Sequence, residues 1–462
     1  MLDINLKSFL ETYRNGKQIE ENLITIQKIS TNSKIVDRDT FFIPIVGEIH
    51  DAHKFIEPIQ NKISGFVFSD YEQVKHIIEN KDRDKLDLIQ VDDTLHFLQE
   101  LAAFYRKQWN GKVIGITGSS GKTSTKDLLA GILSSKYKVF KTQGNLNSQI
   151  GTALSLLSIE KDVDVAVLEL GMSDFGEIKR LMEITKPDIG IIINVYSAHL
   201  ESLKTLDNVA LCKGEMAEYL ENDKLLILNE DNSFVKEMKK RFNGRVQFYS
   251  TNKSSDLNIE NFEEIFIDSN GIKFNVVHED RVHELILKNS YNKYNVSNCL
   301  ASCLAATEFG LSFNDIQNGL DRIEYTKMRM EKVEKSGLQF INDAYNSNPD
   351  SLKAAIDSFS SIDIQGNKYL VIGDMLELGE KKVLLHENIS DYIIETKIYF
   401  TLTFGELSHK LCKQMERNKK QVRHFQTHEE IAKFIKKNVG PKDLVLLKGS
   451  RGMRMEKILD FI

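Results

Sequence analysis

Cysteine, proline and long apolar runs are scarce in this sequence, and each scarcity excludes something. The 462 residues include only 4 cysteines and 5 prolines. The cysteines lie in apolar or helical contexts, so we expect reduced core thiols in a cytoplasmic protein rather than a disulfide framework. No apolar run reaches the length of a membrane span, and the first residues lack the basic-then-apolar order of a signal peptide. The four cysteines are Cys212, Cys299, Cys303 and Cys412.

An excess of charge of one sign is also missing. The chain has 61 basic and 67 acidic residues, which gives a formal net charge of −6. This balance predicts no bulk attraction to nucleic acid or to anionic membranes, so we expect neither as a partner. Apolar residues make up 41% of the chain, which is ample for several cores. At roughly 150 residues per domain, the length suggests about three domains.

Apolar, strand-like runs alternate with helical patterns along most of the chain, without internal repeats. They divide it into a small α/β segment (1–108), a central segment (109–322) and a second α/β unit (323–462). Such alternation predicts parallel sheets with helices on both faces, and ligands then sit at the carboxyl ends of the strands. The central segment has strand-like runs at 113–117, 163–170, 189–195 and 225–229.

The most informative stretch is a small-residue loop between a strand and a helix. The run Gly118-Ser119-Ser120-Gly121-Lys122-Thr123-Ser124 follows the apolar strand that ends at Thr117. Backbone N–H groups of such a loop can bind phosphate oxygens. Lys122 would neutralise the β- and γ-phosphates, and the Thr123 hydroxyl would ligate Mg²⁺. The stricter eight-residue form would have glycine where this chain has Ile116, so the loop is the shorter variant.

Three further residues invite a chemical interpretation. Glu169 ends an otherwise apolar strand, where a carboxylate is costly unless it is paired or binds a metal. His199 follows the next strand end, where a metal-ligand role competes with that of an ordinary surface or core histidine. Lys213 lies on a predicted helix, and its spacing alone favours a solvated lysine paired with a glutamate.

Several motifs together resemble the Mur ligase family. They are the phosphate loop, Gly144-Asn145-Leu146-Asn147-Ser148-Gln149-Ile150-Gly151, Glu169-Leu170-Gly171-Met172, Asn194 with His199, Lys213-Gly214-Glu215, Asp343-Ala344-Tyr345-Asn346-Ser347-Asn348-Pro349, Gly373-Asp374-Met375-Leu376-Glu377-Leu378-Gly379 and Lys448-Gly449-Ser450-Arg451. The resemblance implies a small N-terminal domain that binds a UDP-linked substrate, a central P-loop ATPase domain and a C-terminal Rossmann-like domain. The Glu-Leu-Gly-Met and Gly-Asp-Met-x-Glu-Leu-Gly forms are typical of the subgroup that adds D-alanyl-D-alanine.

The resemblance also implies an ATP-dependent carbon–nitrogen ligase, which joins D-alanyl-D-alanine to a UDP-N-acetylmuramoyl-tripeptide through an acyl phosphate. It implies two Mg²⁺ ions and reaction in the cytoplasm during peptidoglycan synthesis, and we expect a monomer. The matching lysine of the family is carbamylated, which reverses the reading of Lys213 from spacing. The resemblance makes Lys122, Glu169, His199 and Lys213 catalytic, and it makes Thr123, Glu169, His199 and Lys213 metal ligands.

Two sets of binding residues also come from the resemblance. Asn295, Arg329 and Asp343 match contacts to the adenine, phosphates and ribose of ATP, the last two reached when the final domain closes. The candidate substrate contacts are Ser33, Asn145, Asn147, Tyr345, Asn346 and Asn348. The sequence departs from the family at Met328, where glycine is usual, and at Asn32-Ser33-Lys34, where Asp-Ser-Arg is usual. A lysine meets a phosphate without the two-pronged geometry of arginine.

Three alternatives stay open. The chain could be a related ligase that adds a different amino acid, although the Gly-Asp-Met-x-Glu-Leu-Gly segment disfavours this. It could be a P-loop GTPase switch, but residues 292–295 lack the aspartate of the guanine-reading Asn-Lys-x-Asp motif. It could be a nucleotide-binding module without catalysis, which substrate-dependent phosphate release would distinguish. The third residue of the tripeptide is not readable from the sequence.

Overall fold

The protein is described from a computed structural model. The structure describes residues 3–13, 15–20, 25–47, 50–80, 86–252, 255–259, 265–266, 271–288 and 294–462. These divide into two compact units. The first comprises Met1–Gly115, Tyr137–Gly171 and Lys179–Asp188, and the second comprises Ile116–Lys136, Met172–Ile178 and Ile189–Ile462. The expected three-segment division stays a prediction.

A five-stranded sheet, in the order β2-β7-β6-β5-β4, dominates the N-terminal part of the first unit. Strands β4 to β7 run parallel, and β2 pairs antiparallel with β7. Apolar side chains such as Phe42, Phe66 and Leu88 form its core with helix α2. The loops after the parallel strands therefore meet at one edge of the sheet. The elements are α1 (Leu6–Thr12), β2 (Gly16–Glu20), β4 (Lys28–Ser30), β5 (Thr40–Phe42), β6 (Gly65–Phe68), α2 (Tyr71–Ile78) and β7 (Asp87–Val91).

The remainder of the first unit carries the strand that ends in Glu169. Strand β10 pairs in parallel with β9, and every residue of β10 is buried. Complete burial of an apolar strand is typical of a sheet covered on both faces. The elements are α3 (Thr94–Gln108), β9 (Val139–Lys141), α5 (Gln149–Leu157), β10 (Val165–Glu169) and α6 (Glu177–Thr185), the last beginning in the second unit.

Strands β11 to β17, which lie in the second unit, belong to one sheet in the order β15-β16-β14-β13-β12-β11, with β17 paired to β16. In the second unit, β11 to β14 pair in parallel, as the alternation of strands and helices predicts. Helix α10 packs on α4 and on β13. The elements are β8 (Lys112–Thr117), α4 (Lys122–Leu133), β11 (Ile189–Ile192), α7 (Leu200–Leu203), α8 (Leu206–Tyr219), β12 (Leu225–Asn229), α9 (Ser233–Glu237), β13 (Arg245–Ser250), β14 (Leu257–Ile259), α10 (Tyr294–Thr307) and α11 (Phe313–Leu320).

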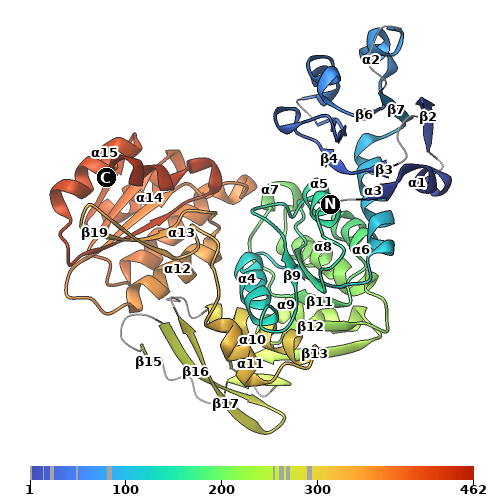
Figure 1. Cartoon of the computed structure of the whole chain (residues 1–462). Helices are drawn as coiled ribbons and strands as arrows, with labels where there is room; N and C mark the ends of the chain where they lie inside the picture. The colour runs from blue at the N-terminus through green and yellow to red at the C-terminus, as the bar shows by residue number, and fades with distance from the viewer. Residues whose placement is uncertain are drawn as a thin grey trace. The chain divides into compact units, whose positions relative to one another are not determined.

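An antiparallel hairpin extends this sheet and is absent from the expectations above. Strands β16 (Gly271–His278) and β17 (Arg281–Lys288) pair along their full length, and α11 packs on β17 (Figure 1). The turn residues Glu279 and Asp280 both have positive φ, as the tightest hairpin turns require. Alternating buried residues in both strands provide the period-two signal that could have predicted the hairpin.

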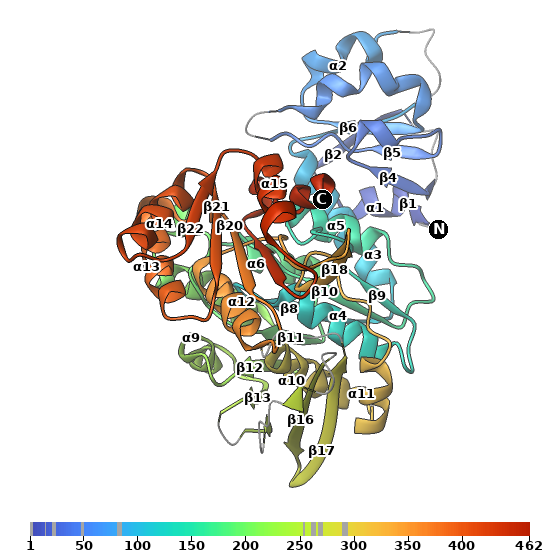
Figure 2. The same ribbon diagram turned by 90° about the vertical axis from the view of Figure 1, so that its left-hand side faces the viewer.

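The C-terminal part of the second unit is a three-layer domain around a six-stranded sheet, ordered β18-β19-β23-β20-β21-β22 (Figures 1 and 2). Only β18 is antiparallel. Helices α12 to α14 cover one face, and α15 with the C-terminal 3-10 helix covers the other. The elements are β18 (Glu331–Lys335), β19 (Leu338–Asp343), α12 (Pro349–Ser361), β20 (Lys368–Gly373), α13 (Lys382–Ile394), β21 (Phe400–Phe404), α14 (Glu406–Arg417), β22 (Val422–Phe425), α15 (His428–Asn438) and β23 (Leu444–Lys448).

All four cysteines are free and buried, as expected. Among the described residues, no helix is both long and apolar enough to cross a membrane.

Candidate active site

The phosphate loop connects β8 to α4 through a glycine that no other residue replaces without strain. Gly121 is the N-cap of α4 with φ +85°, and it has no side chain that could cap the helix. A Cβ at this position would lie 2.7 Å from the Asn298 Oδ1 atom. The glycine is therefore required both by its left-handed backbone and by the close approach of α10. The N-terminus of α4, which begins directly after Gly121, favours a bound anion.

Asn194 braces the same loop from the segment after β11. Its side chain accepts a hydrogen bond from the Ser120 backbone N–H (2.9 Å) and donates one to the Ser120 carbonyl oxygen (3.0 Å). The Asn194 carbonyl also accepts from the Ser119 N–H, 3.1 Å away. These amides therefore shape the loop, and the phosphate-binding role falls to the N-terminal turn of α4. The sequence singled out Asn194 by its position at a strand end and through the family resemblance.

Lys122 and Thr123 begin α4, and both side chains lie over the loop. The Lys122 ammonium donates a hydrogen bond to the Gly118 carbonyl oxygen over 2.6 Å. Thr123 is buried, and its hydroxyl accepts a hydrogen bond from the Arg329 guanidinium over 3.3 Å. Ser124 follows in the same turn. The structure thus brings Arg329, which lies about 200 residues further along the chain, to the phosphate loop.

Lys213 lies inside the second unit rather than on a solvated helix face. It is on α8 and is only 1% exposed. Burial, followed by the positive charge of Lys122, lowers the pKa of Lys213 well below its usual value. Gly214 leaves room for Arg241, because a Cβ there would lie 2.4 Å from the guanidinium. The surface-lysine interpretation from spacing is therefore wrong.

His199 faces a turn from the C-terminal domain. It has φ +55°, and its Nδ1 atom lies 3.0 Å from the Glu377 carboxylate. The hydrogen bond from His199 lowers the pKa of Glu377. The Glu377 carbonyl also accepts from the Glu201 N–H, and Gly379 lies against the Leu200 carbonyl. The Gly-Asp-Met-x-Glu-Leu-Gly motif therefore packs on the His199 turn, a contact that its sequence did not reveal.

Glu169 lies at the end of β10 in the first unit and is only 1% exposed. The Thr142 hydroxyl accepts a hydrogen bond from the Glu169 N–H. The Asn147 amide donates to the Glu169 carboxylate over 3.4 Å, and Gly171 donates to the Asn147 carbonyl. Asn147, which we expected to contact substrate, thus orients this carboxylate. A shared site for Glu169 and the residues of the second unit stays a prediction.

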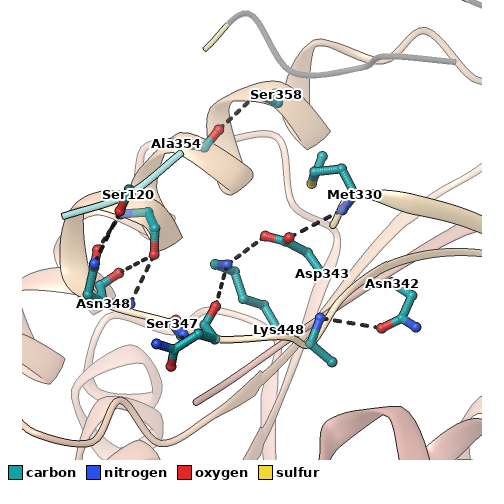
Figure 3. Close-up of polar contacts among 12 residues, drawn as sticks. Ser120, Met330, Asn342, Asp343, Ser347, Asn348, Ala354, Ser358 and Lys448 are labelled. Atoms are coloured by element: carbon teal, nitrogen blue, oxygen red, sulfur yellow. Dashed lines mark hydrogen bonds and ion pairs between the residues drawn. The ribbon is translucent and has the colours of Figure 1, made fainter. Parts of the chain in front are cut away.

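The carboxyl ends of β19 and β23 carry a buried ion pair (Figure 3). The Lys448 ammonium lies 2.5 Å from one Asp343 oxygen and also donates to the Asn346 carbonyl. The other Asp343 oxygen accepts from the Met330 N–H. Asp343 therefore organises this sheet edge, and its predicted contact with ribose stays a prediction. Lys448 was quoted in the sequence only as part of a motif.

The N-terminus of α12 also reaches the phosphate loop. Asn348, the N-cap of α12, donates to the Ser120 hydroxyl over 3.2 Å (Figure 3). Asp350 accepts a hydrogen bond from the Ser197 N–H over 3.1 Å. Asn348 was expected to contact substrate, and here it links the C-terminal domain to the loop. Tyr345, another expected substrate residue, lies under the Arg329 guanidinium, 4.0 Å from ring centroid to Cζ.

The other predicted residues lie as follows. Asn295 is buried on α10, and its side chain accepts a hydrogen bond from Asn298. Ser33 begins a short 3-10 helix after β4, at the sheet edge where loops of the first unit meet. Asn145 is exposed in the loop before α5. Residues 292 and 293, which belong to the GTPase-like alternative, lie outside the described residues. Within the described ranges, no three His, Cys, Asp or Glu side chains lie close enough together to hold a metal. The predicted metal ligands also include a threonine hydroxyl and a modified lysine, which are not among these residue types.

The protein-family model described as "Mur ligase middle domain" matches residues 116–306 of this chain. A second family model, described as "Mur ligase, glutamate ligase domain", matches residues 328–451. The UDP-N-acetylmuramoyl-tripeptide–D-alanyl-D-alanine ligase of Bacillus subtilis is 33% identical over 458 residues, which cover 98% of this chain and 96% of that protein.

Solved structures of MurF ligases are also similar to this chain. A crystal structure of MurF from Acinetobacter baumannii is 26% identical, with a TM-score of 0.88 over 99% of this chain and 98% of that one. The MurF ligase of Thermotoga maritima, in complex with ADP, is 26% identical, with a TM-score of 0.80 over 94% of this chain and 97% of that one. The chain therefore belongs to the Mur ligase family, in the group of D-alanyl-D-alanine-adding ligases.

Proposed function

We propose that this protein is an ATP-dependent ligase that joins D-alanyl-D-alanine to a UDP-N-acetylmuramoyl-tripeptide in peptidoglycan precursor synthesis. The observation that carries the proposal is the braced phosphate loop, with Lys122 above it, in a chain 33% identical to the Bacillus subtilis ligase of that name. Four free, buried cysteines are in keeping with a reducing compartment, and we place the reaction in the cytoplasm.

The chemistry explains why a ligase needs a phosphate loop. A carboxylate is a poor electrophile because it has no leaving group. Transfer of the γ-phosphoryl group of ATP to the terminal carboxylate of the tripeptide gives an acyl phosphate and ADP. The amine of D-alanyl-D-alanine then attacks the acyl carbon, loses a proton, and expels inorganic phosphate as the amide bond forms. Bringing a carboxylate and a γ-phosphate together requires positive charge.

The residues that supply this charge belong to the loop and to the C-terminal domain. Lys122 would lie against the β- and γ-phosphates, where the N-terminus of α4 also favours an anion. Arg329 enters the same region, since its guanidinium donates to the Thr123 hydroxyl. Asn295 would contact the adenine, and closure of the C-terminal domain would complete the site.

The predicted metal ligands fit Mg²⁺ by their chemistry. The Thr123 hydroxyl, Glu169 carboxylate, His199 imidazole and a Lys213 carbamate offer mainly oxygen donors, which suit a hard cation. Two bound Mg²⁺ ions would neutralise the phosphate and carboxylate charges. Glu169 supports this assignment, because a carboxylate that is 1% exposed is stabilised by a nearby cation.

Carbamylation of Lys213 is the finer part of the proposal. An uncharged lysine amine adds to CO₂ and releases a proton, which converts a cation into an anionic oxygen ligand. The burial of Lys213 and the nearby Lys122 charge favour the uncharged amine that this step needs. We expect Lys213→Ala to be inactive and partly rescued by a short carboxylate. Full activity of Lys213→Ala or Lys213→Arg would refute the carbamate, since neither side chain forms it.

The decisive experiment measures phosphate release with ATP, D-alanyl-D-alanine and each of two UDP-tripeptides, the lysine type and the diaminopimelate type. We expect release only when dipeptide and one tripeptide are both present, with the amide product found by mass spectrometry. Lys122→Ala should lower the rate by roughly 10²–10³-fold. If the rate of nucleotide hydrolysis does not depend on either peptide substrate, the result would instead favour a nucleotide switch.

A further inference from the structure

Arg329 sits in a backbone segment that is held on both sides. Met328 and Met330 have φ values of +61° and +53°, which are unusual for residues with side chains. The Glu331 carboxylate accepts from the Met328 N–H, and Asp343 accepts from the Met330 N–H. The backbone around Arg329 is therefore fixed, but these contacts do not fix its long side chain.

The aromatic ring of Tyr345 contacts the Arg329 side chain and restricts its position. The Arg329 guanidinium lies 4.0 Å from the centre of the Tyr345 ring, within the range of a cation–π contact. The Tyr345 N–H also donates to the Met328 carbonyl over 3.2 Å, so ring and backbone of one residue hold the same segment. Arginine stacks on aromatic faces better than lysine does, because its cation is planar.

The Arg329 guanidinium has an unsatisfied hydrogen-bond donor beside the phosphate loop. One terminal nitrogen donates to the Thr123 hydroxyl in the phosphate loop, over 3.3 Å. The Nε atom is buried and has no hydrogen-bond partner. A buried guanidinium N–H without a partner is costly, and an incoming phosphate oxygen would satisfy it.

We propose that Tyr345 is a positioning residue that holds the Arg329 guanidinium for the phosphates of ATP, rather than a contact to the peptide substrates. This inference rests on the proposed function, because it assumes that ATP binds at the Thr123 loop. The consequence is specific: removing the ring weakens nucleotide binding and leaves the binding of D-alanyl-D-alanine as it was.

The test compares Tyr345→Leu with Tyr345→Phe, which keeps the ring. ATP affinity is measured by calorimetry without peptide substrates, and KM values are measured for ATP and for D-alanyl-D-alanine. We expect Tyr345→Leu to weaken ATP binding by about 3- to 30-fold. Tyr345→Phe should show a smaller loss, within about threefold of the wild-type affinity. A raised KM for the dipeptide with normal ATP affinity would overturn the proposal, as would equal losses in the two variants.

A double-mutant cycle guards against a general folding defect. If the ring acts through the guanidinium, Arg329→Lys and Tyr345→Leu should have strongly non-additive effects on ATP affinity. Full additivity would overturn the proposal even if one single variant is unstable. Failure of the wild-type protein to bind ATP would instead refute the proposed function, so the two failures are distinguishable.

Discussion

Substituting Gly121 by alanine tests the geometry of the phosphate loop most directly. The new side chain would have φ +85°, and left-handed backbone costs a residue with a Cβ about 1–2 kcal/mol. Its Cβ would also lie 2.7 Å from Asn298, which must move and lose its buried hydrogen bond to Asn295, worth about 0.5–1.5 kcal/mol. The two costs amount to roughly 1.5–3.5 kcal/mol.

We expect most of this cost to appear as lost ATP affinity. The loop can relax in the free protein, but relaxation moves the N-terminal turn of α4 out of register with the phosphates. Calorimetry should therefore show ATP binding weakened by about 10- to 400-fold. Gly310→Ala is the matched control, since Gly310 has φ +71° with open space around its Cβ position. That variant has the backbone strain alone, far along the chain from the loop.

A second variant isolates the steric part. Gly121→Ala combined with Asn298→Ala removes the atom that the new Cβ would meet. The double variant should therefore bind ATP more tightly than Gly121→Ala alone, although less tightly than the wild type. If the double variant binds no better than Gly121→Ala, the approach of Asn298 is not what excludes a side chain at position 121.

Three more predictions follow from single contacts. Asn194→Asp removes the donor to the Ser120 carbonyl and adds charge beside the phosphate site, so ATP affinity measured by calorimetry should fall at least about tenfold; an unchanged affinity would contradict the bracing role. Lys213→Met should raise the free energy of unfolding at neutral pH in CO₂-free buffer, because the lowered pKa means that the folded wild type binds fewer protons there; the gain should shrink as pH rises toward 10.5, and a gain independent of pH would refute this. Glu377→Gln should lower that free energy by less than about 1 kcal/mol, since the hydrogen bond with His199 is partly exposed; the difference should vanish as pH falls through the lowered pKa of Glu377, and its persistence in acid would exclude this contact as its source.

The fold was predictable wherever apolar runs formed buried parallel strands. Strands β8, β10 and β12 lie where the pattern places them, because each is almost continuously apolar and buried. The β16–β17 hairpin was missed, since its short alternating pattern follows a long region already assigned to helices and parallel strands. Strand β11 ends at Ile192 rather than at residue 195, a boundary error that an apolar run alone does not correct.

The site was only partly predictable, because its contacts join residues far apart in the chain. The loop from Gly118 to Thr123 carried its own signal in residue type and spacing. The partners of that loop, Asn194 and Arg329, are about 75 and 200 residues away, and no local pattern links them to it. Spacing also misassigned Lys213, since burial depends on what packs around a helix rather than on the helix sequence.

The Asn194 side chain acts on the phosphate loop as a peptide group would. Its amide accepts from the N–H and donates to the carbonyl of a single residue, Ser120, as a neighbouring strand does. The loop thus gains the directional pairing of a sheet without an additional strand, at a point where glycine-rich backbone is otherwise free to adopt many shapes. Aspartate has nearly the same outline but cannot donate, and leucine can do neither. The conformation of the phosphate loop therefore depends on two separate parts of the chain, the loop itself and the segment that carries Asn194. Grafting the glycine-rich segment alone onto another sheet would transfer its sequence without its conformation.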